Sequence, residues 1–200
     1  MEFQEFPKMP RLSREIIISE KIDGTNGQIF IKEFDSDYMA EGRCVHEKGD
    51  LALYVGSRTR WITPDDDNYG FARWCKEHAD ELLLLGPGRH FGEWWGQGIQ
   101  RNYGMKEKRF SLFNVGRWAD DAVRPACCHV VPELYRGAFN TQIIELELDL
   151  LRTDGSKAAP GYKFPEGIVI FHTSANIGFK KTLERDDGKW NEKMHKVPSG

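Results

Sequence analysis

Long apolar runs and secretion signals are missing from this 200-residue chain. No stretch approaches the roughly 18 consecutive apolar residues that a membrane-spanning helix needs. The opening residues, MEFQEFPKMPRLSREIIIS, lack the basic region and the apolar region of a signal peptide. These absences predict a soluble protein that is not secreted and has no membrane partner.

Cysteine is scarce, and the four that occur, Cys44, Cys75, Cys127 and Cys128, contain no CxxC pair. The two adjacent cysteines are poorly placed to link distant parts of the chain. Neither a disulfide framework nor a zinc site is therefore indicated. A reducing compartment, and hence a cytoplasmic location, is favoured.

An excess of positive charge is also absent, because 28 Lys and Arg residues face 31 Asp and Glu residues. The net charge of −3 argues against nucleic-acid binding by bulk attraction alone. One segment departs from this average: between Arg101 and Arg109, only Glu107 opposes four basic residues. Such a segment is usually a solvated surface.

Repeats and flexible linkers are missing, so residues 1–200, with 40% hydrophobic content, are expected to form a single domain. Apolar spacings of three and four predict a helix from Asn68 to the stop at Gly86-Pro87. Residues 141–151 fit either period, and we predict a helix because Asn140 and Thr141 can cap it. β-Branched runs predict strands at 15–20, 27–34, 51–57, 90–95, 110–118, 128–131, 167–172 and 178–183. This pattern predicts an α+β fold of antiparallel sheets with flanking helices.

The most informative string is EKIDGTN at 20–26, which lies between two predicted strands and contains the pattern KxDG. A lysine on such a turn acts as a nucleophile when neighbouring cations or burial keep its amine neutral. Asp23 and Gly24 would shape the turn and let the backbone approach a nucleotide closely. On this string alone, a plain hairpin with DG as its turn residues is the simpler interpretation.

Further strings follow in order: GSR at 56–58, FGE at 91–93, GQGIQ at 96–100, FSLFNV at 110–115, EGIVI at 166–170 and GFKK at 178–181. This order and spacing resembles the covalent nucleotidyltransferase superfamily of ATP-dependent ligases and capping enzymes. FGEWWGQGIQRNYG followed by RFSLFNV is most similar to the RNA ligase 2 group. The resemblance covers about 19–183 and implies the ATP-grasp-like ligase adenylation fold. It also implies ATP with Mg²⁺ or Mn²⁺ as cofactors.

The resemblance implies roles for individual residues. Lys21 matches the lysine that attacks the ATP α-phosphate and holds AMP as a phosphoramidate. Arg58 matches an arginine that contacts the nucleotide or the ends to be joined. Glu93 matches an acidic residue that binds the ribose or a divalent metal, and Glu166 matches a metal-binding carboxylate. The nucleotide-binding set also includes the neighbours of the lysine, Glu20, Asp23, Gly24 and Asn26.

Phe113 matches the aromatic residue that stacks on adenine, and a core position is its structural alternative. Phe110 and Phe113 lie three residues apart in a predicted strand, so they point to opposite faces. We therefore expect one ring in the core and the other in the nucleotide site.

Lys180 matches a lysine that contacts the α-phosphate. The family often has a second lysine two positions later, where this chain has Thr182, whereas Lys181 lies on the opposite strand face. Either a register shift at Gly178-Phe179 presents Lys181 to the site, or one cation suffices. Both lysines are kept in the predicted nucleotide-binding set.

The implied function is an ATP-dependent RNA ligase that forms lysyl-AMP, adenylylates a 5′-phosphate end and joins it to a 3′-hydroxyl. A DNA ligase or capping guanylyltransferase core is an alternative, but those enzymes normally carry an oligonucleotide-binding fold after the last motif. Only 17 residues follow Leu183. A non-catalytic nucleotide-binding relative in a repair complex is a further alternative, against which the intact KxDG and both glutamates argue.

Without an accessory domain, the chain resembles the adenylyltransferase domain alone. We expect it to bind RNA ends weakly or to use an accessory protein or RNA-binding partner, and to be a monomer. The basic segment 101–109 lies between the FGE and FSLF strings, so it is expected to grip strand phosphates. The resemblance fits an intracellular protein, including one encoded by a phage.

Overall fold

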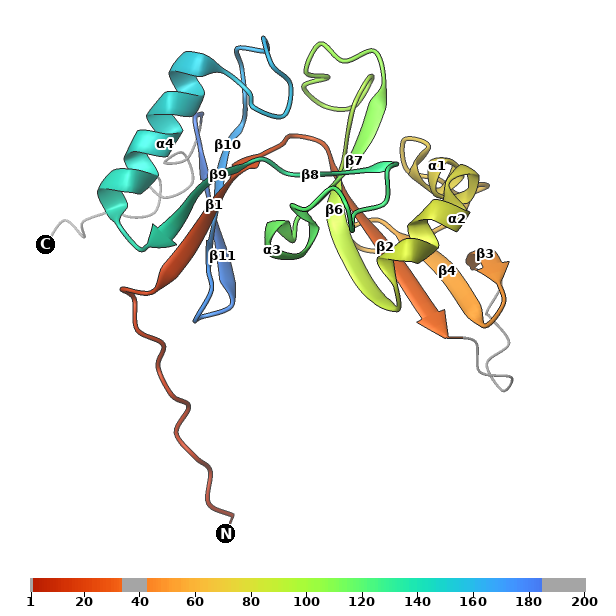
Figure 1. Cartoon of the computed structure of the whole chain (residues 1–200), viewed down its shortest axis with the longest axis horizontal. Helices are drawn as coiled ribbons and strands as arrows, with labels where there is room; N and C mark the ends of the chain where they lie inside the picture. Colours follow the sequence, from red (N-terminus) through yellow and green to blue (C-terminus); the bar gives the residue numbers. More distant parts are fainter. Residues whose placement is uncertain (1, 34–42, 185–200) are drawn as a thin grey trace, which may run out of the picture. The chain divides into compact units, whose positions relative to one another are not determined.

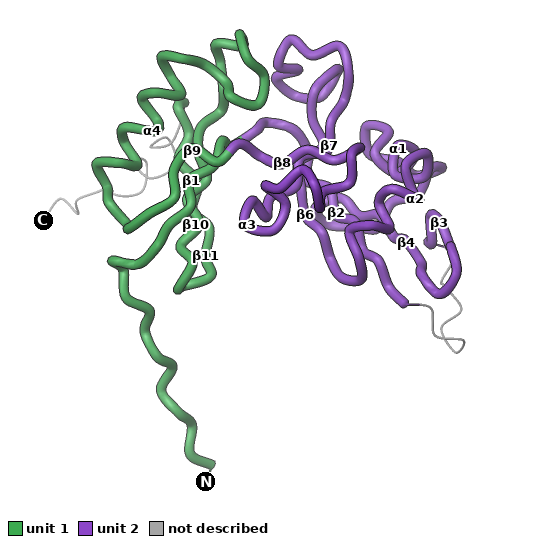
Figure 2. The backbone as a smooth tube through the Cα atoms, viewed as in Figure 1, with its two compact units in different colours: residues 1–21, 133–200 green, residues 22–132 purple. Residues whose placement is uncertain are grey.

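The computed structural model describes residues 2–33 and 43–184, within two compact units (Figures 1 and 2). Unit 1 comprises residues 1–21 and 133–200, and unit 2 comprises residues 22–132. The first crossing between the units falls inside the KIDG string. No Gly-, Pro- or Ser-rich segment marks either crossing, which is why the sequence predicts a single domain.

Unit 1 is built on a four-stranded sheet in the order β11-β10-β1-β9. Every neighbouring pair in it is antiparallel. Helix α4, Thr141–Asp154, packs its buried Leu148 and Leu151 against Ile16, Ile18 and Ile168 of the sheet. The strands are β1 (Glu15–Lys21), β9 (Glu133–Ala138), β10 (Gly167–His172) and β11 (Ile177–Thr182).

Strand alternation gives the unit 1 sheet two different faces. Ile16 and Ile18 pack toward α4, so Glu20 projects from that same side. Lys21 projects from the other side, which we call the Lys21 face. Residues that stand opposite one another in an antiparallel pair share a face.

Unit 2 is built on a seven-stranded sheet, ordered β3-β4-β2-β6-β7-β8 with β5 paired to β4. Only β7 and β8 pair in parallel among these strands. The strands are β2 (Thr25–Glu33), β3 (Cys44–Lys48), β4 (Leu51–Gly56), β5 (Trp61–Ile62), β6 (Gly88–Gly96), β7 (Lys108–Leu112) and β8 (Cys128–Val130). The helices are α1 (Phe71–Glu77), α2 (Ala79–Leu82), the 3-10 helix η1 (Leu83–Leu85) and α3 (Val115–Trp118).

Aromatic rings fill the core of unit 2 between the sheet and α1. The ring centroid of Phe71 lies 5.3 Å from that of Trp94 and 4.9 Å from that of Phe110. Gly27 on β2 leaves space for this packing, because a Cβ there would lie 2.7 Å from the Phe71 ring. Packing of the unit 2 core therefore requires a glycine at position 27, three residues after the KIDG string.

The predicted α+β fold of antiparallel sheets with flanking helices is confirmed. The helical segment after Asn68 is present as α1, α2 and η1, and α4 begins where predicted, with the Asn140 side chain accepting from Gln142 N at 2.8 Å. The predicted strand 110–118 is wrong in its second half. The strand β7 ends at Leu112, and the Asn114 side chain caps α3 instead.

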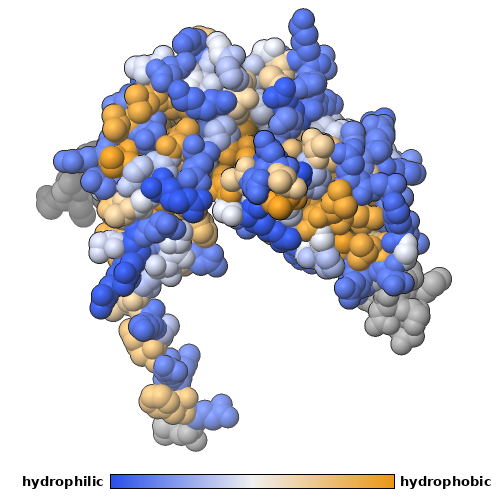
Figure 3. All heavy atoms as spheres, in the orientation of Figure 1, coloured by the Kyte–Doolittle hydropathy of each residue, from blue (hydrophilic) through white to orange (hydrophobic). Residues whose placement is uncertain are grey.

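Other differences are smaller. Strands β3, β5 and β9 were not predicted, and the predicted end of β2 at Phe34 lies outside the described residues. Within the described part, no helix is both long and apolar enough to cross a membrane. Residues 2–14 form no helix or strand and expose apolar side chains, among them Phe3 and Phe6 (Figure 3).

Candidate functional site

In unit 1 the predicted nucleophile contacts a predicted metal ligand. Lys21 Nζ lies 2.6 Å from Glu166 Oε2, although the two residues are 145 positions apart. The side chains are 23% and 18% exposed, so the ion pair is partly shielded but open to solvent. Register explains the contact: Lys21 stands opposite Gly167, and Glu166 directly precedes that glycine. The antiparallel pairing of β1 with β10 therefore builds this part of the site.

The two lysines of β11 project from opposite faces of the unit 1 sheet. Lys180 stands opposite Val169, which stands opposite Ser19 on β1, so Lys180 shares the Lys21 face. Lys181 faces α4, where its Nζ donates to Glu145. Pairing of β10 with β11 is regular from one end to the other, so no register shift brings Lys181 to the Lys21 face.

Glu20 is buried on the α4 side of the sheet, with 1% of its surface exposed. Its Oε1 accepts from Ser156 Oγ at 2.6 Å, and its Oε2 accepts from the backbone N of Lys157 at 2.7 Å and of Ala158 at 2.8 Å. Burial raises the pKa of the Glu20 carboxyl above its usual range, against the lowering effect of these hydrogen bonds. The Glu20 carboxylate therefore holds the 156–158 loop, and the place of Glu20 in the nucleotide-binding set stays a prediction.

In unit 2 the carboxylate of Glu93 fastens the turn that follows Lys21. Glu93 Oε1 accepts from Gly24 N at 3.0 Å, and Oε2 accepts from Asn26 Nδ2 at 3.2 Å. Gly24 packs so closely on β6 that an added Cβ would lie 2.5 Å from the carbonyl oxygen of Trp94. The KIDG string thus needs a glycine at position 24 because its backbone packs directly on β6. The structure brings three predicted site residues together here, namely Gly24, Asn26 and Glu93.

Asp23 is held by two residues of the loop between β6 and β7. Its backbone N donates to Tyr103 Oη at 2.9 Å, and its Oδ2 accepts from Arg101 Nε at 3.0 Å. Tyr103 is 2% exposed, has a positive φ of 51°, and stacks edge-on against Trp95. Sequence reasoning did not single out Tyr103, since one tyrosine in the QRNYG string carries no recognisable chemistry. Its buried contact with the motif aspartate appears only in three dimensions.

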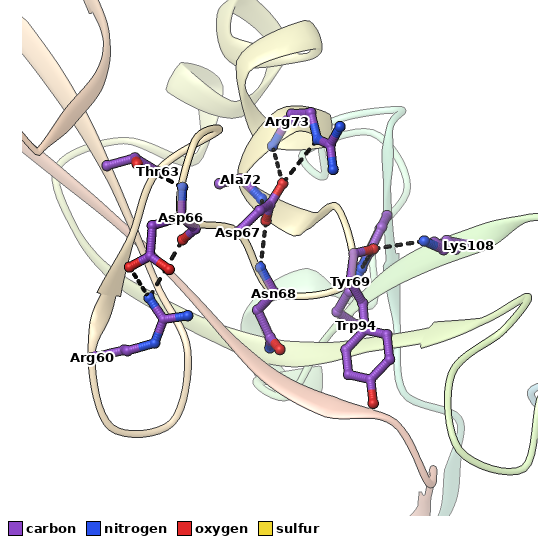
Figure 4. A network of polar contacts seen from close by, with 10 residues as sticks. All are labelled: Arg60, Thr63, Asp66, Asp67, Asn68, Tyr69, Ala72, Arg73, Trp94 and Lys108. Carbon is purple, nitrogen blue, oxygen red and sulfur yellow. Dashed lines mark hydrogen bonds and ion pairs between the residues drawn. The ribbon is translucent and has the colours of Figure 1, made fainter.

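The loop before α1 is tied to the helix (Figure 4) and also to the start of β2. The carboxylate of Asp67 accepts from Ala72 N at 2.8 Å and Arg73 N at 3.1 Å, which satisfies donors at the helix start. Asn68 Nδ2 donates to Thr25 Oγ1 at 3.0 Å. The chain beside Gly24 is therefore fixed from a second direction.

The basic segment 101–109 is less free than its sequence suggests. Three of its four basic side chains bond within unit 2: Arg101 to Asp23, Lys108 to the carbonyl of Tyr69 (Figure 4) and Arg109 to Glu107. Lys106 is exposed and makes no hydrogen bond or ion pair with the described residues. Of the four basic side chains expected to bind phosphates, only Lys106 can do so without first losing a partner among the described residues. The other three would have to exchange their present partners for a phosphate.

The two phenylalanines of FSLF divide between core and surface. Phe110 is fully buried, whereas Phe113, one residue beyond β7, is 41% exposed. The backbone N of Phe113 donates to the carbonyl of Phe91 at 2.9 Å, which fixes the chain at that point. Arg58 is exposed on the turn between β4 and β5, and no described residue pairs with it.

Comparisons with solved structures support the fold. An apo mutant of Naegleria gruberi RNA ligase matches with a TM-score of 0.57 and 18% identity, over 90% of this chain and 52% of that chain. Another mutant of that ligase, with ATP and Mn, matches with a TM-score of 0.59 and 18% identity, over 89% and 52% of the two chains. The chain thus spans about half the length of these structures, and at this identity the matches show a shared fold alone.

Sequence comparison is decisive for the family. No curated protein gives a significant match. The family model for RNA ligase, however, matches residues 14–187, which include every residue of the predicted site. This chain belongs to the RNA ligase family.

Proposed function

We propose that this chain is the adenylyltransferase part of an ATP-dependent RNA ligase, with Lys21 as its nucleophile. The observation that carries the proposal is the contact of Lys21 Nζ with Glu166 Oε2 at 2.6 Å, on a lysine that belongs to the KxDG string. Membership of the RNA ligase family supplies the class of reaction. Structures of similar fold that contain ATP and Mn, or AMP and Mn, support the choice of nucleotide.

The first step is the transfer of AMP to Lys21. An ammonium group has no free electron pair, so Lys21 must lose a proton before it attacks. Glu166 Oε2 lies within hydrogen-bond distance of that proton and can accept it. The new bond joins Nζ to the α-phosphorus, and the bond from that phosphorus to the β-phosphate oxygen breaks. The products are lysyl-AMP and pyrophosphate.

The carboxylates fit a divalent cation unequally. Mg²⁺ and Mn²⁺ prefer oxygen ligands, and Mg²⁺ is usually held by one or two carboxylates together with substrate phosphates. Glu166 fits this role because its carboxylate is partly exposed on the Lys21 face. Both oxygens of Glu93 already accept hydrogen bonds, so we assign Glu93 to the ribose. When bound, the cation would neutralise charge on the phosphates.

The remaining residues serve binding and positioning. Lys180 contributes positive charge on the Lys21 face, where it would contact the α-phosphate. Glu20 is a positioning residue, because it fixes the end of β1 to the 156–158 loop. Phe113 offers an exposed ring for stacking on adenine, and Asp23 shapes the turn through Tyr103.

The later steps join RNA ends. An oxygen of a 5′-phosphate attacks the phosphorus of lysyl-AMP, the P–N bond breaks, and the amine of Lys21 is restored. A 3′-hydroxyl then attacks the 5′-phosphorus and AMP leaves, which seals the strand. We propose that the chain acts as an intracellular, cytoplasmic monomer, and that an accessory RNA-binding partner strengthens its hold on RNA ends.

The test is to incubate the full chain with α-labelled ATP and divalent cation and to ask whether label stays on the denatured protein. We expect labelling with ATP, none in Lys21→Ala, and normal labelling in Lys181→Ala, whose side chain faces α4. Labelling by GTP in preference to ATP would point to a capping enzyme. Absence of labelling by either nucleotide would point to a non-catalytic relative.

A further inference from the structure

Three of the four cysteines gather beside a histidine–glutamate pair in unit 2, and none of these residues has a role assigned above. Cys75 and Cys128 are buried in the core, and Cys127 packs against it with its Sγ 4.0 Å from that of Cys128. His78 Nδ1 lies 3.5 Å from Glu81 Oε1. The ligand atoms of His78, Glu81 and Cys127 all lie within 4.8 Å of one another.

Two of these three donors, His78 and Glu81, are held by their surroundings. His78 stands at the junction of α1 and α2, and its ring packs on Trp74 with centroids 4.9 Å apart. Glu81 Oε2 accepts from the backbone N of Cys127 at 3.1 Å, which leaves Oε1 directed toward His78. The carboxylate therefore already joins α2 to the loop that precedes β8, and its orientation is fixed.

We propose that His78, Glu81 and Cys127 form a Zn²⁺ site with water as the fourth ligand, and that the bound ion stabilises unit 2. A set of one imidazole nitrogen, one carboxylate oxygen and one thiolate suits Zn²⁺, whereas Mg²⁺ and Ca²⁺ prefer oxygen throughout. Zinc–ligand distances of about 2.0 to 2.3 Å place tetrahedral ligand atoms about 3.3 to 3.8 Å apart. The His78–Glu81 separation of 3.5 Å already fits this range.

The remaining separations, to Cys127 Sγ, close by rotation of the Cys127 side chain, which is only half-buried. Cys128 is not assigned as a ligand, because its side chain is buried in the core and lies outside the group formed by His78, Glu81 and Cys127. On binding, the Cys127 S–H proton is released to solvent and a sulfur–zinc bond forms. The ion would link the α1–α2 segment to the loop before β8, which stabilises the folded state of unit 2.

The cysteine spacing in the sequence does not indicate this site. Zinc patterns are usually recognised from CxxC or HxxxH pairs, whereas these donors come from the α1–α2 junction, from α2 and from a loop residue 46 positions beyond Glu81. The absence of a CxxC pair therefore does not bear on a site of this composition.

The experiment uses the full chain, stripped of metal and kept reduced, and titrates it with Co²⁺ and then Zn²⁺. We expect one equivalent of Co²⁺ with a thiolate charge-transfer band, displacement by Zn²⁺, and a higher melting temperature. Cys127→Ser should abolish the band and weaken binding at least tenfold. Cys44→Ser is the matched control, because Cys44 lies on β3 outside the cluster, and it should bind normally.

A second variant keeps the test decisive if Cys127→Ser does not fold. His78→Gln should weaken Co²⁺ binding at least tenfold while the metal-free circular dichroism spectrum stays unchanged. Equal Co²⁺ affinity in wild type and His78→Gln would overturn the proposal. A loss of Co²⁺ binding in Cys44→Ser as large as that in Cys127→Ser would overturn it too. None of these readouts depends on ligase activity, so they are separate from the test of Lys21.

Discussion

Glu20 and Lys21 are adjacent in the chain, yet their side chains leave opposite faces of the unit 1 sheet. Glu20 is buried and accepts three hydrogen bonds from residues 156–158, whereas Lys21 contacts Glu166 on the other face. The buried Glu20 carboxylate fixes the C-terminal end of β1 to the 156–158 loop. The lysine beside it is therefore held at a defined position while its amine stays accessible.

Glu20→Gln is expected to lower the free energy of unfolding by about 1 to 3 kcal/mol. A glutamine keeps one acceptor oxygen, and its amide nitrogen would meet a donor that now bonds to Glu20. Urea denaturation measures this change. Glu15→Gln on the same strand is the matched control, because Glu15 forms only a long, exposed ion pair with Arg136, and it should change stability by less than about 0.5 kcal/mol.

Glu20 should also give a recognisable pH dependence. Burial raises its folded-state pKa above the ordinary value of 4.5, so the folded protein binds this proton more readily than the unfolded chain. The resulting contribution to stability is complete below pH 4.5 and is lost as pH rises through the folded-state pKa. The stability difference between wild type and Glu20→Gln should therefore shrink with rising pH. A difference that grows instead would mean a lowered pKa.

Lys180→Ala is expected to slow adenylylation by about 100-fold, as removal of a group that stabilises charge in a transition state often does. Lys181→Ala should leave the rate within about twofold, because Lys181 faces α4 and bonds to Glu145. Single-turnover labelling by ATP measures both rates. Equal effects of the two substitutions would contradict the assignment of Lys180 to the Lys21 face.

Phe113→Ala should weaken ATP binding by about 1 to 3 kcal/mol, the range found for base stacking on an aromatic ring. The melting temperature of the Phe113→Ala variant should hardly change, since the Phe113 ring is 41% exposed. Phe110→Ala should instead lower stability by about 3 to 5 kcal/mol, because it leaves a cavity in the core of unit 2. Calorimetric titration with ATP and thermal melts separate the two. Loss of the fold in Phe113→Ala would contradict its assignment to adenine.

Local patterns in the sequence predicted much of the fold. The β-branched run at 15–20 predicted strand β1, and the Asn140 cap predicted the start of α4. The predicted strand failed after Leu112, because a single Asn114 cap outweighs the strand-like composition that follows. Short edge pairs such as β5 carry too few residues to show a period.

The residues of the candidate site were predictable only where they belong to a recognised motif. Lys21, Glu93 and Glu166 were identified through family strings, but their partners depend on pairings between residues far apart in the chain. Tyr103 was missed because its contact with Asp23 spans 80 positions. Nothing in the local sequence of Glu20 distinguishes a buried carboxylate that caps a loop from one that contacts a nucleotide.

The last prediction concerns the substrate. If the chain acts as an RNA ligase, it should seal a nick with an RNA 3′-hydroxyl strand faster than an all-DNA nick. Three of the four basic side chains of 101–109 already have partners in unit 2, so few cations of this segment are available for phosphates. Sealing under subsaturating conditions should therefore fall only moderately with salt, and Lys106→Ala should reduce the log–log salt slope by about one unit. The measurement compares matched duplexes that differ only in the sugar of the 3′-hydroxyl strand, at low and moderate salt. Equal or faster sealing of all-DNA nicks would overturn the RNA assignment, whereas Lys21 labelling would still establish adenylyltransferase activity.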